Sequence, residues 1–168
     1  MATARGDLDA AETAYQACLH IAQQLAEADP TNAQAQRDLS VSHTKMGDLA
    51  TARGNLDAAE TAYQADLRIA QQLAEADPTN AQAQRDLSIS HTKMGDLATA
   101  RGNLDAAEAA YQASLLIRQR LAEADPTNAQ AQRDLSVSHS NVGDLATARG
   151  DLDAAETAYQ ACLTLRSN

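Results

Sequence analysis

The sequence predicts an all-α protein, an α-solenoid in which antiparallel helix pairs stack in a row. Three observations support this. The 168-residue chain repeats itself every 48 residues, proline or glycine breaks each repeat twice, and neither phenylalanine nor tryptophan occurs. The apolar residues are therefore mainly alanine and leucine, which pack closely between helices and suit a β-sandwich poorly. A short repeat cannot bury its own apolar face, whereas a row of repeats can.

The repeats define a single array over residues 1–168. Four equivalent glycines open them, and the first two blocks differ at only four positions, which indicates recent duplication or design. Because the chain starts and stops inside a repeat, we expect it to be a piece of a longer array. The complete repeats cover residues 6–53, 54–101 and 102–149, and a partial repeat covers 150–168.

Each repeat contains two amphipathic helices. From Leu56 to Leu73, apolar or small residues recur at steps of three and four, which predicts one helix, here called helix B. After the turn at Asp29-Pro30-Thr31-Asn32, where Thr31 or Asn32 can act as N-cap, the same steps predict helix A. The predicted helices, starting and ending on a helix B, are 7–28, 33–53, 56–76, 81–101, 104–124, 129–149 and 151–165.

The turn between helix A and helix B has two candidate glycines. Gly47 and Gly54 open similar heptads, so either could mark it. We place the turn at Gly54, since this choice gives two helices of equal length. Gly47 then lies inside helix A at a cost of about 1 kcal/mol relative to alanine, and it would permit close contact between helices.

The repeat resembles a lengthened tetratricopeptide repeat. The family signature of W-x2-L-G-x2-Y, A-x3-F and P corresponds here to Gln36-x2-Leu39-Ser40-x2-His43, Ala59-x3-Tyr63 and Pro78. The 14 residues beyond the family's 34-residue unit amount to about one heptad per helix. The resemblance implies a right-handed superhelix of helix pairs and a concave groove lined by helix A.

The helical stripes predict the core and the exposed ends. We expect Tyr15, Tyr63 and Tyr111 to be buried and to pack near Leu39, Leu87 and Leu135. In the last helix, Leu152, Tyr159 and Leu163 keep the apolar register of their buried copies. Because no helix A follows, we expect this face to remain partly exposed and to mediate association of copies through their end helices.

Composition excludes several classes of function. A net charge of −10 argues against nucleic-acid binding, which requires a basic surface. The sequence has no apolar run of spanning length and no signal peptide behind its first residues. We therefore expect a cytoplasmic protein without nucleic-acid or membrane partners.

No residue pattern predicts catalysis, a cofactor or a metal. His43, His91 and His139 are repeat copies, and stacked repeats hold copies too far apart to share a zinc ion, whose bonds to nitrogen are about 2.1 Å long. We expect them to lie between helices, and Cys18 and Cys162, three repeats apart, to be free thiols. Asp66 is expected near water, or beside Arg68 or Arg85.

The remaining hypothesis is recognition of a protein or peptide in the groove implied by the resemblance. Valine or isoleucine flanked by arginine and lysine suits a peptide with acidic and apolar residues. The alternative is a designed, consensus or excised array with a purely structural or self-assembling role, in which Arg37 and its copies only neutralise adjacent acids such as Asp38. The candidate binding residues are Arg37, Val41, Lys45, Arg85, Ile89, Lys93, Arg133 and Val137.

Overall fold

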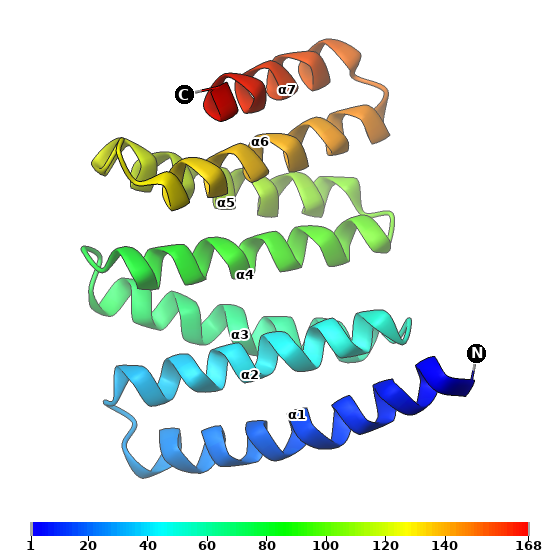
Figure 1. Cartoon of the computed structure of the whole chain (residues 1–168), viewed down its shortest axis with the longest axis vertical. Coiled ribbons are helices and arrows are strands. Elements are labelled where there is room, and N and C mark those ends of the chain that lie inside the picture. Colours follow the sequence, from blue (N-terminus) through cyan, green and yellow to red (C-terminus); the bar gives the residue numbers. More distant parts are fainter. Residues whose placement is uncertain (1, 168) are drawn as a thin grey trace. The chain divides into compact units, whose positions relative to one another are not determined.

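In the computed structural model, residues 2–167 are described, and the described chain consists of seven α-helices without a strand (Figure 1). Every predicted helix is present, with ends within two residues of the prediction except at the start of the first. The helices are α1 (Ala2–Ala28), α2 (Ala33–Ala52), α3 (Leu56–Ala76), α4 (Ala81–Ala100), α5 (Leu104–Ala124), α6 (Ala129–Arg149) and α7 (Leu152–Ser167).

The helices form two compact units, Met1–Asp77 with α1 to α3 and Pro78–Asn168 with α4 to α7. Within each unit, every helix packs against the next one along the chain, and consecutive helices run antiparallel (Figure 1). This is the stacking of helix pairs that the sequence predicts. None of the described helices combines the length and the apolar character that crossing a membrane requires.

Short polar turns begin and end the helices. The side chains of Asn32, Asn80 and Asn128 accept hydrogen bonds from backbone N–H groups in the first turns of α2, α4 and α6. Gly54 has φ +74° in the left-handed region, where glycine avoids the steric cost of a side chain, and it lies in the turn between α2 and α3. Gly47 lies inside α2. The choice of Gly54 for the turn is therefore confirmed.

Glycine and tyrosine from paired helices form the repeated core contact. Tyr111 is 7% exposed, and an added Cβ at Gly95 would lie only 2.5 Å from the Tyr111 Cε1 atom. The Tyr111 hydroxyl donates a 2.8 Å hydrogen bond to Asp96, one residue beyond that glycine. Burial raises the pKa of Tyr111 to about 12. Gly47 with Tyr63 and Gly143 with Tyr159 repeat this arrangement, so the glycine inside helix A does permit close contact.

The core prediction is confirmed only in part. Tyr63, Tyr111 and Leu135 are buried, and Leu135 packs in a cluster with Leu115 and Ala122. Tyr15, Leu39 and Leu87 are instead half-buried. The most deeply buried position of helix A in this region is the residue after the predicted leucine, Ser40 or Ser88, so the apolar stripe is rotated slightly from the one drawn on the sequence.

Candidate functional site

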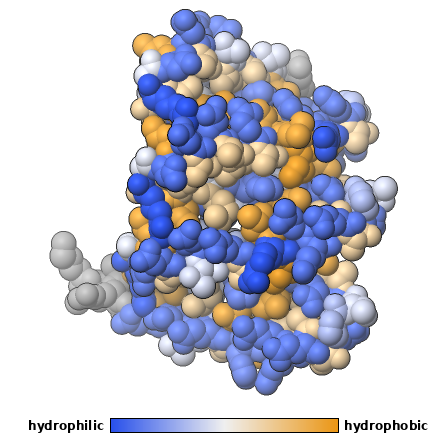
Figure 2. All heavy atoms as spheres, turned by 180° about the vertical axis from the view of Figure 1, so that it is seen from behind, coloured by the Kyte–Doolittle hydropathy of each residue, from blue (hydrophilic) through white to orange (hydrophobic). Residues whose placement is uncertain are grey.

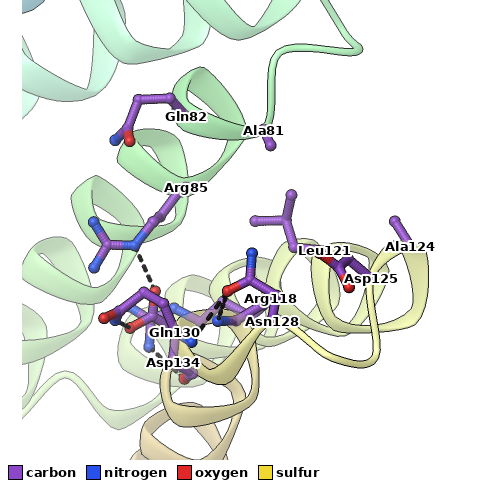
Figure 3. A pocket seen from close by; sticks show the side chains of 11 residues that line it. Ala81, Gln82, Arg85, Arg118, Leu121, Ala124, Asp125, Asn128, Gln130 and Asp134 are labelled. Atoms are coloured by element: carbon purple, nitrogen blue, oxygen red, sulfur yellow. Dashed lines mark hydrogen bonds and ion pairs between the residues drawn. The ribbon is translucent and has the colours of Figure 1, made fainter.

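A cavity of about 390 Å³ lies within the second unit, between α4, α5 and α6 (Figure 3). One end is polar, where Arg85 from α4 approaches Gln130 and Asp134 from α6. Leu121, Ala124 and Asp125, from the end of α5, lie at the opposite end in Figure 3. The other residues that line the cavity are Ala81, Gln82, Arg118, Asn128 and Ala131.

Arg85 is oriented by an acid of the next repeat. Its Nε donates to Asp134 Oδ2 at 2.6 Å, while Gln130 Nε2 donates to Asp134 Oδ1 at 2.7 Å. Asp134 therefore uses both oxygens to hold the groups beside it. The alternative role proposed for the arginines, neutralisation of acids, applies at Arg85, although its partner lies on the following helix A and not next to it in sequence.

Arg118 is the charged residue that sequence reasoning missed. It is 5% exposed, on α5, and its Nε donates to Ser88 Oγ at 3.1 Å. Its Nη1 donates to the Asp134 carbonyl and to Ser138 Oγ, each at 3.0 Å, and its Nη2 donates to Thr92 Oγ1 at 3.3 Å. All four acceptors are neutral oxygens, and they come from both helices that pack on α5.

The electrostatic surroundings of Arg118 are unusual for so buried a charge. Burial lowers the pKa of its guanidinium, Asp134 opposes this effect, and the like charge of Arg85 adds to it. Asp96 also raises this pKa, so two carboxylates and one other guanidinium act on Arg118. The signal in the sequence was a change from alanine, since Ala22 and Ala70 occupy the same repeat position.

The other predicted binding residues lie on helix A, but they do not converge on this cavity. Arg133 and Val137 line a different cavity, beside Ser136 and Leu165. In the first unit, Val41 and Lys45 line a cavity with Tyr15 and Cys18. Arg37, Ile89 and Lys93 are half-buried on their helices. Of the eight residues, only Arg85 lines the cavity between α4, α5 and α6.

The three repeated histidines are half-buried, and burial lowers the pKa of each one. At His43, Asp66 partly opposes this effect and Arg68 adds to it. Among the described residues, no group of three or more histidine, cysteine, aspartate or glutamate side chains could hold a metal ion. The described residues therefore give these histidines no partners with which to share a metal ion.

One repeat position of helix B holds Cys18, Asp66, Ser114 and Cys162 in successive repeats. Asp66 is buried and accepts a hydrogen bond from Ser40 Oγ, so its expected place near water is wrong. Its copy Ser114 bonds Thr92 at 2.9 Å, and Cys162 lies 3.2 Å from Ser136 Oγ. Both cysteines are free thiols, Cys18 exposed and Cys162 buried. Hydroxyl groups of helix A, from Ser40, Thr92 and Ser136, thus bond the residue at this position in three repeats.

The fold and the repeated contacts define a class, that of all-helical repeat proteins. The family model of the tetratricopeptide repeat matches residues 138–168, in α6 and α7. Residues 138–168 are thus similar to the tetratricopeptide repeat, and the seven helices of the described chain fit a tetratricopeptide-like repeat protein.

The matched segment begins at Ser138, after Gln132, Leu135 and Ser136, the copies of the residues first assigned to the start of the signature. It does contain Gly143, which packs against Tyr159 in α7. The matched segment therefore leaves out the copies of Gln36, Leu39 and Ser40, which lie in α6 before Ser138.

Among solved structures, the chain is similar to "Crystal structure of BtubC (BKLC) from P. vanneervenii", with a TM-score of 0.36 and 15% sequence identity. The match covers 95% of this chain and 91% of that one. No curated protein sequence matches this chain.

Proposed function

We propose that this chain is a non-catalytic scaffold that binds a peptide with acidic and apolar residues along its A helices. Tetratricopeptide repeats are in general protein-interaction modules, and the match to that family supports the coarser statement that the chain is an interaction scaffold. The preference for an acidic peptide is supported by the geometry of Arg85, which donates to Asp134 through Nε alone. Its terminal nitrogens retain the fork of donors that suits a ligand carboxylate.

The distribution of charge on the surface favours an acidic peptide only at certain places. Hydrophilic side chains cover most of the face in Figure 2, and the whole chain carries a net charge of −10. An acidic peptide is therefore repelled by most of the surface and attracted only where arginines and lysines gather. Arg133 and Val137, exposed beside each other on α6, provide one such combination of charge and apolar surface.

Reversing Arg37, Arg85 and Arg133 to glutamate is expected to abolish peptide capture. Dodecapeptides are selected on the chain from a random library displayed on phage. The selected peptides are then synthesised with capped ends, and their affinity is measured at several salt concentrations. Peptides rich in glutamate or aspartate with leucine or valine should be enriched, and their affinity should fall as salt rises.

A matched control for this experiment reverses Arg68, Arg101 and Arg120, which are exposed outside the candidate set, to glutamate. It changes the net charge by the same amount. Circular dichroism should show unchanged helicity for both variants. Equal loss of binding in the control, or enrichment of peptides without acidic residues, would contradict the proposal.

A second candidate function is self-association, and exposed leucines on α7 favour it. Leu152 is 68% exposed and Leu163 62%, whereas Leu115, the copy of Leu163 in α5, is buried against Leu135 of α6. In the first unit, Ile21 and Leu25 on α1 are also exposed. We propose that a second copy covers the face of α7, in line with a structural or self-assembling role.

Replacing Leu163 with lysine is expected to shift self-association to higher concentration. Static light scattering over a wide concentration range measures it, at moderate salt so that repulsion between chains of charge −10 is screened. Gln160→Lys, which adds the same charge at an exposed position of α7, is the control. A parent chain that stays monomeric throughout, or equal shifts in both variants, would contradict this candidate.

A further inference from the structure

We infer that the polar end of the cavity between α4, α5 and α6 is a subsite for the side-chain carboxylate of a bound peptide, with Arg85 as its donor and Arg118 as the buried charge behind it. The inference rests on the proposed function, because it names the chemical group that one part of the peptide presents. It adds a residue of helix B, Arg118, to a recognition surface otherwise assigned to helix A.

The first argument is an imbalance of charge at the polar end. Two guanidinium groups, those of Arg85 and Arg118, line this end beside one carboxylate, that of Asp134, while Asp96, which also raises the pKa of Arg118, does not line the cavity. Asp125 also lines the cavity, but Figure 3 places it at the opposite end, and its Oδ1 already accepts from the backbone N–H and the hydroxyl of Thr127. One further carboxylate would therefore balance the cluster.

The second argument concerns the donors that remain. Arg118 donates its hydrogen bonds to neutral oxygens of Ser88, Thr92, Ser138 and the Asp134 backbone. No carboxylate among the described residues accepts a hydrogen bond from it. Arg85 donates to the Asp134 carboxylate through Nε alone, and its two terminal nitrogens point away from that carboxylate in Figure 3. A ligand oxygen can approach those nitrogens without displacing the Asp134 bond.

The third argument is the structural support around both arginines. Gln130 and Arg85 hold Asp134 from two sides at 2.7 and 2.6 Å, and Asp134 in turn orients Arg85. Arg118 is anchored to α4 through Ser88 and to α6 through Ser138. The charges are therefore fixed before a ligand arrives, which lowers the entropic cost of binding. In a partly enclosed cavity their attraction for a carboxylate exceeds that of exposed arginines.

The apolar end of the cavity indicates what accompanies the carboxylate. Ala81, Leu121 and Ala124 line it away from Arg85 in Figure 3, so there is room for a small apolar group of the same peptide. An acidic side chain followed by a small apolar residue fits this division. In the first two repeats alanine stands at this position, as Ala22 and Ala70, so those repeats have no equivalent charge.

The test uses capped glutamate, N-acetyl-glutamate amide, as probe and the whole chain as receptor. Its binding is followed through the Nε–Hε signals of Arg85 and Arg118 in 15N NMR spectra. We expect saturable shifts of both signals with a dissociation constant on the order of 1 mM, as for a single charge-assisted contact of a small molecule. N-acetyl-glutamine amide, which has the same shape without the charge, should give no saturable shift.

Arg118→Ala should weaken the binding of capped glutamate at least about tenfold, because the buried charge is lost. Arg120→Ala removes an exposed arginine from the same helix and should leave the affinity unchanged. Alanine at position 118 matches Ala22 and Ala70 of the first two repeats, so a folded variant is expected. If circular dichroism shows otherwise, Arg118→Lys serves instead, since it keeps the charge, loses the fork of donors and should bind with intermediate affinity.

Three results would overturn the inference. The first is that Arg118→Ala and Arg120→Ala bind capped glutamate with equal affinity. The second is that capped glutamine shifts the two signals as much as capped glutamate does. The third is that N-acetyl-alanine, whose carboxylate is terminal, binds as tightly as capped glutamate or more tightly. The first would leave Arg118 as a purely structural link between α4 and α6. The probe is a single residue and needs neither Arg37 nor Arg133. If capped glutamate binds but no peptide is captured, the proposed function alone is contradicted. If peptides are captured but capped glutamate does not bind, the subsite alone is contradicted.

Discussion

Replacing Tyr111 with alanine is expected to destabilise the second unit by about 3–5 kcal/mol, the cost of removing a large buried aromatic side chain. Tyr111 fills the space between α4 and α5 in a cluster with Ala107 and Leu145, and its ring lies directly over Gly95. The variant loses this packing and leaves Asp96 without the hydroxyl that donates to it. Urea unfolding followed by circular dichroism measures the change.

Two controls separate packing from hydrogen bonding in this experiment. Tyr111→Phe keeps the ring and loses only the bonds with Asp96 and Thr99, so about 0.5–1.5 kcal/mol is expected. Tyr15→Ala removes the half-buried copy in α1 and should cost less than Tyr111→Ala. A loss below about 1 kcal/mol for Tyr111→Ala would show that the ring contributes little to the core.

Replacing Gly95 with alanine is expected to destabilise the same unit by about 1–2 kcal/mol, although alanine is the better helix former. The helix propensity of alanine favours the variant by about 1 kcal/mol. Against this, the new Cβ would stand 2.5 Å from Tyr111 Cε1 and 2.6 Å from Cδ1, so the ring has to move. Its hydroxyl is held by Asp96 and Thr99, and displacement in a packed core costs about 1–3 kcal/mol or more.

A double-mutant cycle tests the cause of that loss. If the clash with the ring is responsible, Gly95→Ala should be much less harmful in a chain that already carries Tyr111→Leu, with a coupling energy of about 1 kcal/mol or more. Urea unfolding of the four chains gives this value. Stabilisation of the parent chain by Gly95→Ala, as helix propensity alone predicts, would show that the contact between α4 and α5 is looser than the structure has it.

The candidate site illustrates how far repetition in a sequence can mislead. Arg37, Arg85 and Arg133 are copies, and the sequence offered no reason to distinguish them. In the structure, Arg85 lines a cavity with Asp134 and Arg118, whereas Arg133 lines another one with Val137. Arg118, which stands where the preceding repeat has Ala70, adds a buried charge to the cavity that Arg85 lines.

The sequence by itself determined the helices. Their boundaries follow from short-range signals, because Pro30, the capping Asn32 and the left-handed Gly54 act within one turn of the chain. The repeat period and the amphipathic stripes then required neighbouring helices to cover one another. These features depend on residues close together in sequence, and for that reason the prediction of seven helices was accurate.

Only the tertiary structure decided which side chains meet across helices. Arg85 pairs with an acid 49 residues away, Arg118 reaches hydroxyls on two neighbouring helices, and Asp66 is buried beside Ser40. Such contacts depend on the rotation and the offset of one helix against the next. A rotation of one helix position changes every partner while leaving the periodicity of the sequence intact. Periodicity therefore predicts that a face is buried, and the packed helices alone determine what each residue on that face contacts.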